Sequence, residues 1–241
     1  MAKRQKLRNV IDILMTALLL LLMAYQITGE MLHEWIGMAM TLLVIVHQIL
    51  NRKWYAALFK GKYSVYRGVS AALNVLLLLS FAFTAFCGMA MSNYATPFLY
   101  GIAKISFVRK MHLSMSHYSF VLMELHIGMH VPVMLQGLKE RQKTIICLLG
   151  CLLAAIGFRL FLKNGCFDYI FFREAFAFLD YDKSAFLVLL ENILMLLFWV
   201  FAGSQCALLL RKTPQKKEKL FPAALLLASV LFGCLLFVLL A

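Results

Sequence analysis

The sequence HEWIGMAMTLLVIVH (residues 33–47) places a histidine at each end of a mostly apolar stretch. This stretch lies inside a longer apolar run, Leu32–Leu50. A run of about 18–25 apolar residues is long enough to cross a bilayer as a helix. Six further runs of this kind occur along the chain: Val10–Thr28, Val69–Met91, Met111–Gln136, Thr144–Leu162, Ala185–Leu210 and Leu220–Leu240. The pattern predicts an all-α, polytopic transmembrane helical bundle of about seven spans.

The composition of the 241-residue chain supports this class of protein. Hydrophobic residues make up 63% of the sequence and charged residues only 15%, and the mean hydropathy is +0.84. A soluble domain needs a more polar surface, and a disordered chain would not contain 20 Phe and 9 Tyr. The scarcity of turn residues, with 4 Pro and 13 Gly, argues against a β-barrel. We therefore expect a multi-pass protein of the cell (cytoplasmic) membrane, surrounded by lipid.

The basic residues predict the orientation of the bundle. Seventeen of the 24 Lys and Arg residues fall on one side when the N-terminus is placed in the cytoplasm. Membrane proteins carry their excess of Lys and Arg on that side, so we expect a cytoplasmic N-terminus. This distribution also explains the net charge of +13, and no nucleic-acid partner is expected. The first run leads directly into the second, so we interpret it as a retained helix and not as a cleaved signal.

All histidines of the chain lie in two of the apolar runs, at His33, His47, His112, His117, His126 and His130. Ionisable side chains inside a bilayer are costly, and their presence indicates function. His33 and His47 are fourteen residues apart, and so are His112 and His126. In a helix, fourteen residues return to within about 40° of the same face after a rise of about 21 Å.

These spacings predict two imidazole pairs at matching depths. Both runs are expected to cross from the outer to the inner side, so His33 would face His112, and His47 would face His126. Two imidazoles that meet across a gap between helices can ligate a haem iron from both sides. We therefore expect two haem b groups, one in each leaflet. His130 lies one turn after His126 and is either the alternative inner ligand or a partner of a haem propionate.

Other residues in these runs would suit a bound porphyrin. Gly37 and Gly128 would let a flat ring approach the helix backbone, whereas His117 points elsewhere and is not expected to be a ligand. Glu124 would hydrogen-bond an imidazole or carry protons for quinol oxidation, or it would be a structural acid that stays protonated. Basic residues close to the ligands would pair with propionates: Arg52, Lys53, Arg109 and Lys110.

The segment 163–184 is rich in aromatic residues and falls on the outer side. Such a composition is typical of a short amphipathic segment at the membrane interface, with a docking surface for an external partner as the alternative. No GxGxxG or GxxxxGK[ST] pattern occurs in the chain, so no nicotinamide or ATP site is expected.

The first half of the chain resembles a known family. Its first part contains Asp12, Thr28-Gly29, His33-Glu34-Trp35-Ile36-Gly37, His47 and Asn51-Arg52-Lys53-Trp54. A looser second copy contains Cys87-Gly88, His112, Phe120-Val121-Leu122-Met123 and His126-Ile127-Gly128-Met129-His130. Together these residues resemble the flavinylation-associated cytochrome family over about residues 7–136. The second copy lacks the His-Glu-Trp triplet and has a long loop, Ser92–Lys110, before its first histidine.

The resemblance implies a membrane b-type cytochrome that works with covalently flavinylated proteins outside the membrane. It implies haem ligation by His33, His47, His112 and His126, and it matches His130 with a further histidine of the family. The implied role is that of an electron-transfer subunit, and we expect it to pass electrons from quinol or a dehydrogenase to an extracytoplasmic flavin protein. We therefore divide the chain into a di-haem four-helix core (1–136) and three additional spans (137–241).

Two other functions would also use membrane histidines. A non-haem metal oxygenase would need its ligands at one depth, but the pairs 112/117 and 126/130 are centred about 20 Å apart along one helix. A transporter or proton channel would use the histidines as relays, although the runs show no clear inverted repeat.

Overall fold

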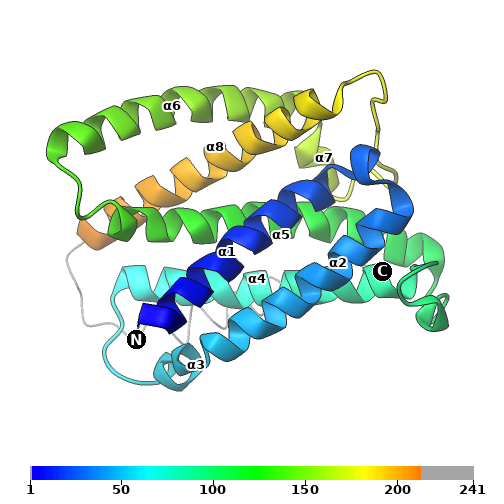
Figure 1. Cartoon of the computed structure of the whole chain (residues 1–241), viewed down its shortest axis with the longest axis horizontal. Coiled ribbons are helices and arrows are strands. Elements are labelled where there is room, and N and C mark those ends of the chain that lie inside the picture. Colours follow the sequence, from blue (N-terminus) through cyan, green and yellow to red (C-terminus); the bar gives the residue numbers. More distant parts are fainter. Residues whose placement is uncertain (1, 213–241) are drawn as a thin grey trace.

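The computed structural model describes residues 2–212, and every regular element in this range is helical. The elements are α1 (Ala2–Met23), α2 (Tyr25–Leu50), α3 (Lys53–Leu58), α4 (Val65–Ala90), the 3-10 helix η1 (Pro97–Leu99), α5 (Ile105–Met134), α6 (Glu140–Lys163), α7 (Cys166–Ile170) and α8 (Ala185–Lys212). The predicted all-α class is therefore confirmed for the described residues (Figure 1).

Four of the helices, α2, α4, α6 and α8, are long and apolar enough to cross a membrane. These helices indicate a membrane protein. The helices α1 and α5 are also long but are not among these four: α1 begins with basic residues, and α5 carries four histidines. The seventh predicted run, Leu220–Leu240, lies outside the described residues.

The first predicted run, Val10–Thr28, is interrupted earlier than expected. α1 ends at Met23, and Ala24 adopts φ −95° and ψ 46°, which is not a helical conformation. A second break occurs inside α2 at Gly29, whose φ of +66° lies in the left-handed region that glycine adopts without steric cost. The chain therefore turns over residues 24–29, and α2 returns alongside α1 (Figure 1).

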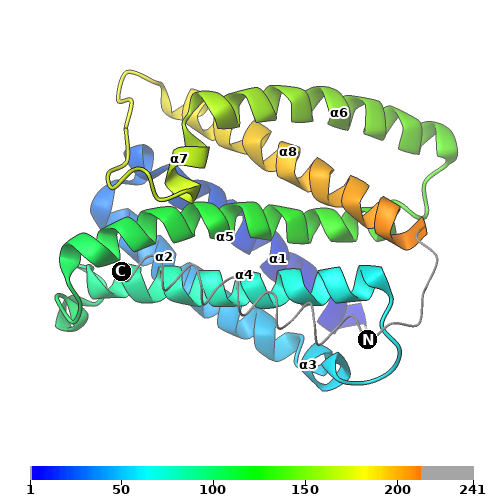
Figure 2. The same ribbon diagram turned by 180° about the vertical axis from the view of Figure 1, so that it is seen from behind.

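The six long helices form three antiparallel pairs: α1 with α2, α4 with α5, and α6 with α8. α5 also packs along α8, so it joins the second pair to the third, and Figure 2 shows α4 and α5 from the other side. We call the end of the bundle with α3 and the α5–α6 turn the α3 end. The opposite end, with η1, α7 and the α1–α2 turn, is the α7 end (Figure 1).

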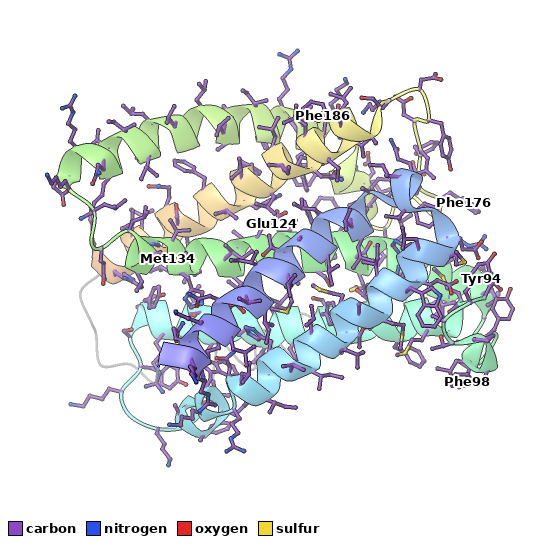
Figure 3. All side chains as sticks on the ribbon, in the orientation of Figure 1. Tyr94, Phe98, Glu124, Met134, Phe176 and Phe186 are labelled. Atoms are coloured by element: carbon purple, nitrogen blue, oxygen red, sulfur yellow. The ribbon has the colours of Figure 1, made fainter. Side chains whose placement is uncertain are left out.

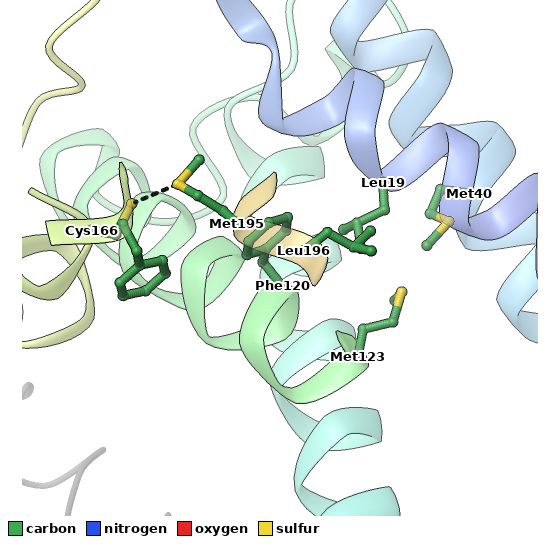
Figure 4. Packing of buried hydrophobic residues seen from close by; sticks show 8 residues of the cluster. Leu19, Met40, Phe120, Met123, Cys166, Met195 and Leu196 are labelled. Carbon is green, nitrogen blue, oxygen red and sulfur yellow. Dashed lines mark hydrogen bonds between the residues drawn. The ribbon is translucent and has the colours of Figure 1, made fainter. Parts of the chain in front are cut away.

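Apolar side chains from six helices pack in the centre of the bundle. The largest buried cluster comprises Leu19, Met40, Phe120, Met123, Phe161, Cys166, Met195 and Leu196 (Figure 4). At its edge, Cys166 Sγ lies 3.9 Å from Met195 Sδ. In a membrane such contacts stabilise the fold through close packing, because lipid tails are as apolar as the side chains.

Glycines allow α8 to approach its two neighbours closely. A Cβ atom on Gly128 would overlap the carbonyl oxygen of Val200 and lie 2.9 Å from the Cα of Gly203. A Cβ atom on Gly157 of α6 would likewise overlap the carbonyl of Leu194. The expectation that Gly128 makes room for a porphyrin is therefore wrong. Two residues turn a helix by about 200°, so Gly128 faces α8 and not the side of His126.

The α5–α8 crossing can be tested with a single methyl group. We expect Gly128→Ala to destabilise the protein by about 1–3 kcal/mol, because two helix backbones must move apart. The thermal unfolding midpoint of the detergent-solubilised protein measures this change. Gly68→Ala is the matched control, since a Cβ atom at this position in α4 meets nothing within 4 Å. Equal midpoints for the two variants would contradict the close crossing.

Candidate functional site

The first two predicted ligands meet at the α7 end of the bundle. The rings of His33 on α2 and His112 on α5 have centroids 6.0 Å apart and planes at 78°. A metal bound to an imidazole nitrogen at about 2 Å places two opposed ring centres about 6 Å apart. The observed separation of the two rings is close to this value.

The ring of His112 is held by α4. Its Nδ1 atom lies 3.0 Å from the carbonyl oxygen of Thr84. One turn further along α4, a Cβ atom on Gly88 would lie 3.1 Å from Cε1 of the ring. A larger residue at this position would push the ring away, so Gly88 provides the close approach to an imidazole that Gly128 does not.

The ring of His33 is enclosed without a comparable hydrogen bond. Tyr25 contacts it edge-on, with ring centroids 5.1 Å apart, and the backbone of Leu22 lies nearby. Its Nδ1 atom is buried and has no hydrogen-bond partner of normal geometry within residues 2–212. The ring of His33 is therefore held less firmly than the ring of His112, which has a hydrogen bond of normal geometry.

The other predicted ligands gather towards the α3 end. His47 Nδ1 lies 2.8 Å from Asp12 Oδ1, and His126 Nδ1 lies 2.7 Å from Asn74 Oδ1. The ring of His130 is 4.9 Å from that of His126, in an edge-on arrangement. His47 and Asp12 are close enough to interact electrostatically with both rings. The structure thus brings together three of the five candidate residues at this end.

Three of the four predicted ligands share one arrangement. In His47, His112 and His126 the hydrogen bond uses Nδ1, which leaves Nε2 available for a metal. A bond at one ring nitrogen fixes the direction of the other and raises its basicity. In each of the helix pairs α1–α2 and α4–α5, the hydrogen-bond partner comes from the first helix and the histidine from the second. α1 supplies Asp12 to α2, and α4 supplies Asn74 and Thr84 to α5.

His117 belongs to neither group. Its Nδ1 atom bonds the carbonyl of Leu113 in its own helix, and its ring stacks on Tyr169 of α7 with centroids 4.5 Å apart. The bond and the stacking orient this histidine towards α7, away from the two histidine groups.

The expected hydrogen bond between Glu124 and an imidazole is not present. Glu124 lies in the middle of the bundle (Figure 3), fully buried, and neither carboxyl oxygen has a partner among the described residues. Glu191 of α8 is instead bonded by Lys183 Nζ at 2.8 Å and by Asn164 Nδ2 at 3.1 Å. These two donors tie both ends of the segment 164–183 to α8.

Exposed aromatic side chains collect at the α7 end (Figure 3). They come from the segment around η1, with Tyr94 and Phe98, and from the predicted aromatic segment, with Phe176. Arg109, one of the candidate propionate partners, lies with its guanidinium 5.9 Å from the ring of Phe176. Arg52 and Lys53 at the α3 end are exposed.

Comparisons with known proteins add nothing to this geometry, because the chain matches no family model, no curated protein and no solved structure. Within residues 2–212, no three His, Cys, Asp or Glu side chains converge so that they could hold a metal ion. A non-haem iron oxygenase typically needs three protein ligands at one position. An iron already held by a porphyrin needs only two.

Glu34, which follows His33, anchors α2 to the loop before η1. Its carboxylate accepts hydrogen bonds from Ser92 Oγ and from the backbone N–H groups of residues 93–95, at 2.7–2.9 Å. Hydrogen bonds to a charged group contribute about 1.5–3 kcal/mol each. The segment His33-Glu34-Trp35 therefore supplies both a candidate ligand, His33, and the carboxylate of Glu34 that fixes the loop 92–95 to α2; we call this set of bonds the clamp.

The clamp predicts the effect of removing this carboxylate. We expect Glu34→Ala to release the loop and to accelerate tryptic cleavage after Lys104 several-fold in the detergent-solubilised protein. Gln26→Ala is the control, since Gln26 lies at the same end and its side chain makes one hydrogen bond within residues 2–212, to the carbonyl of Asp180. Cleavage of Glu34→Ala at the rate of the control would contradict the clamp.

Proposed function

We propose that this protein is a membrane b-type cytochrome that passes electrons across the membrane through two bis-histidine haems. The observation that carries the proposal is the placement of the ligands. One pair of histidines meets at the α7 end, and the others gather towards the α3 end, with Nδ1 held and Nε2 available in three of the four. The fourteen-residue spacing corresponds to about 21 Å between the two positions.

When bound, each haem iron supplies a one-electron site that alternates between the ferric and ferrous states. The chain's own residues orient the imidazoles. Asp12 increases the electron-donating strength of His47, because its carboxylate faces Nδ1 at 2.8 Å. Asn74 and Thr84 give His126 and His112 neutral partners. Only the α3 end therefore has a carboxylate bonded to a candidate ligand, so the reduction potentials of the two haems would differ.

We infer that His126 is the inner ligand opposite His47. Its ring is half-buried and is oriented by Asn74, whereas His130 lies one turn further along and is exposed. An oriented ring loses less conformational freedom on binding a metal. In this arrangement His130 would lie close to the haem without ligating it.

The proposed topology follows from the basic residues. We place the N-terminus and the α3 end in the cytoplasm, with about seven spans in total, because Lys and Arg concentrate at this end. The aromatic side chains at the α7 end would then lie at the outer interface. Electrons would enter from membrane quinol or a dehydrogenase. They would leave towards an extracytoplasmic flavin protein, which is the kind of partner that the resemblance of residues 7–136 implies.

Haem content tests the ligand assignment. We expect the purified protein to show a b-type reduced-minus-oxidised spectrum with about two haems per chain. His33→Ala and His47→Ala should each lose about one haem, from opposite ends of the bundle. His117→Ala is the control and should keep both, because its ring stacks on Tyr169. A folded wild-type protein that binds no haem would overturn the proposal.

The pair of Asp12 and His47 gives an independent test. We expect Asp12→Asn to raise the midpoint potential of one haem, since a less basic imidazole stabilises the ferric iron less, and to weaken haem retention by about tenfold or more. Potentiometric titration of the absorption bands measures this shift. Glu140→Gln removes an acidic residue from the same end without a histidine contact, because Glu140 pairs with Lys143. Equal potentials in both variants would argue against ligation by His47.

A further inference from the structure

One face of α1 carries a guanidinium one helical turn before the residue that contacts His47. Arg4, Arg8 and Asp12 are spaced four residues apart, so they lie on one side of the helix. Arg4 Nη2 and Arg8 Nη2 both donate to the carbonyl of Leu50 at the end of α2, at 3.0 Å and 2.5 Å. Asp12, one turn after Arg8 on α1, contacts His47, which lies on α2 like Leu50. Arg8 is thus fixed within one helical turn of the residue that orients His47.

Arg8 has a donor that the protein does not use. Its Nε atom is buried, and no acceptor for it exists within residues 2–212. Its one hydrogen bond among these residues is the bond from Nη2 to Leu50. A buried N–H of a charged group is costly to leave unpaired. The carbonyl of Leu50 is already bonded by Arg4, so capping of α2 does not account for the buried Nε donor.

The unused donor suits a carboxylate. Guanidinium Nε–H and Nη–H groups form a planar fork that matches the two oxygens of a carboxylate. Haem carries two such groups in its propionates, and these extend towards the membrane surface when the ring lies between transmembrane helices. A lipid phosphate offers similar oxygens, but the Nε atom is buried, and Asp12, one turn further along the same face of α1, contacts His47.

We infer that Arg8 binds a propionate carboxylate of the haem at the α3 end, with Arg4 and the Leu50 carbonyl holding its guanidinium in place. This inference rests on the proposed function. It assigns to α1 a direct part in holding the cofactor, whereas the basic residues next to the histidines in sequence, Arg52 and Lys53, are exposed. A guanidinium that is already ordered gives up little further freedom when it binds.

The test compares haem with its dimethyl ester, which has the same ring but no carboxylates. Both forms are loaded into the full-length protein, and the rate of haem transfer to excess apomyoglobin is measured. With two sites, haem should leave in two kinetic phases. The phase that is missing in His47→Ala belongs to the site at the α3 end. In the wild type we expect the free-acid form to leave this site about tenfold more slowly than the ester, as a charge-assisted pair requires. In Arg8→Gln the two forms should leave at nearly equal rates.

Lys6→Gln is the control, because it removes a cation from an exposed position on another face of α1. It should keep the tenfold difference. If Arg8→Gln also keeps it, the assignment of Arg8 is wrong and the cytochrome proposal stands. If Arg8→Gln keeps it but loses binding to phosphatidylglycerol vesicles, the partner is a lipid phosphate and the assignment is again wrong. If the folded wild type takes up neither form, both proposals fail.

Discussion

The hydrogen bond at Nδ1 is the interaction on which the proposed site depends. An imidazole in an apolar bundle has few polar neighbours, so its ring direction is determined by whichever group satisfies one nitrogen. Here a carboxylate, an amide and a backbone carbonyl serve His47, His126 and His112. Each partner lies on the helix before the histidine. The helix pairs α1–α2 and α4–α5 therefore each orient their own candidate ligands, and the packing between the helix pairs needs only to bring the rings close together.

α5 connects this region to the rest of the bundle. One side of it carries His112 and His126 against α4, while Gly128 packs against α8 on another side. One helix thus carries the candidate ligands and the close crossing on different faces, about 200° apart around its axis. The helices α6 to α8 contribute no candidate ligand in the described residues. They hold α5 in place through small residues and a buried cluster of aromatic and sulfur-containing side chains.

Periodicity predicted the helices and the two groups of histidines, because apolar length and fourteen-residue spacing are local properties of the chain. It did not predict what surrounds the rings. Asn74 is a lone amide in an apolar run, and such a residue indicates a buried polar contact. Thr84 gives no such signal, because it acts through its backbone carbonyl, which any residue would supply. A glycine indicates a close approach without identifying the neighbour. The sequence therefore does not show that Gly128 approaches α8 and not a porphyrin, or that Gly88 approaches the ring of His112. The end of α1 was placed five residues late, since an apolar pattern does not reveal the break at Ala24.

The central claim is that electrons cross the membrane through this chain. The most direct measurement uses proteoliposomes that enclose ferricyanide and receive a membrane-impermeant reductant outside. The account predicts that ferricyanide is bleached much faster in vesicles with the wild-type protein than in empty vesicles, and that His47→Ala, which interrupts the path at one end, abolishes the difference. Bleaching no faster than in empty vesicles, from a wild-type protein that holds two haems, would contradict it.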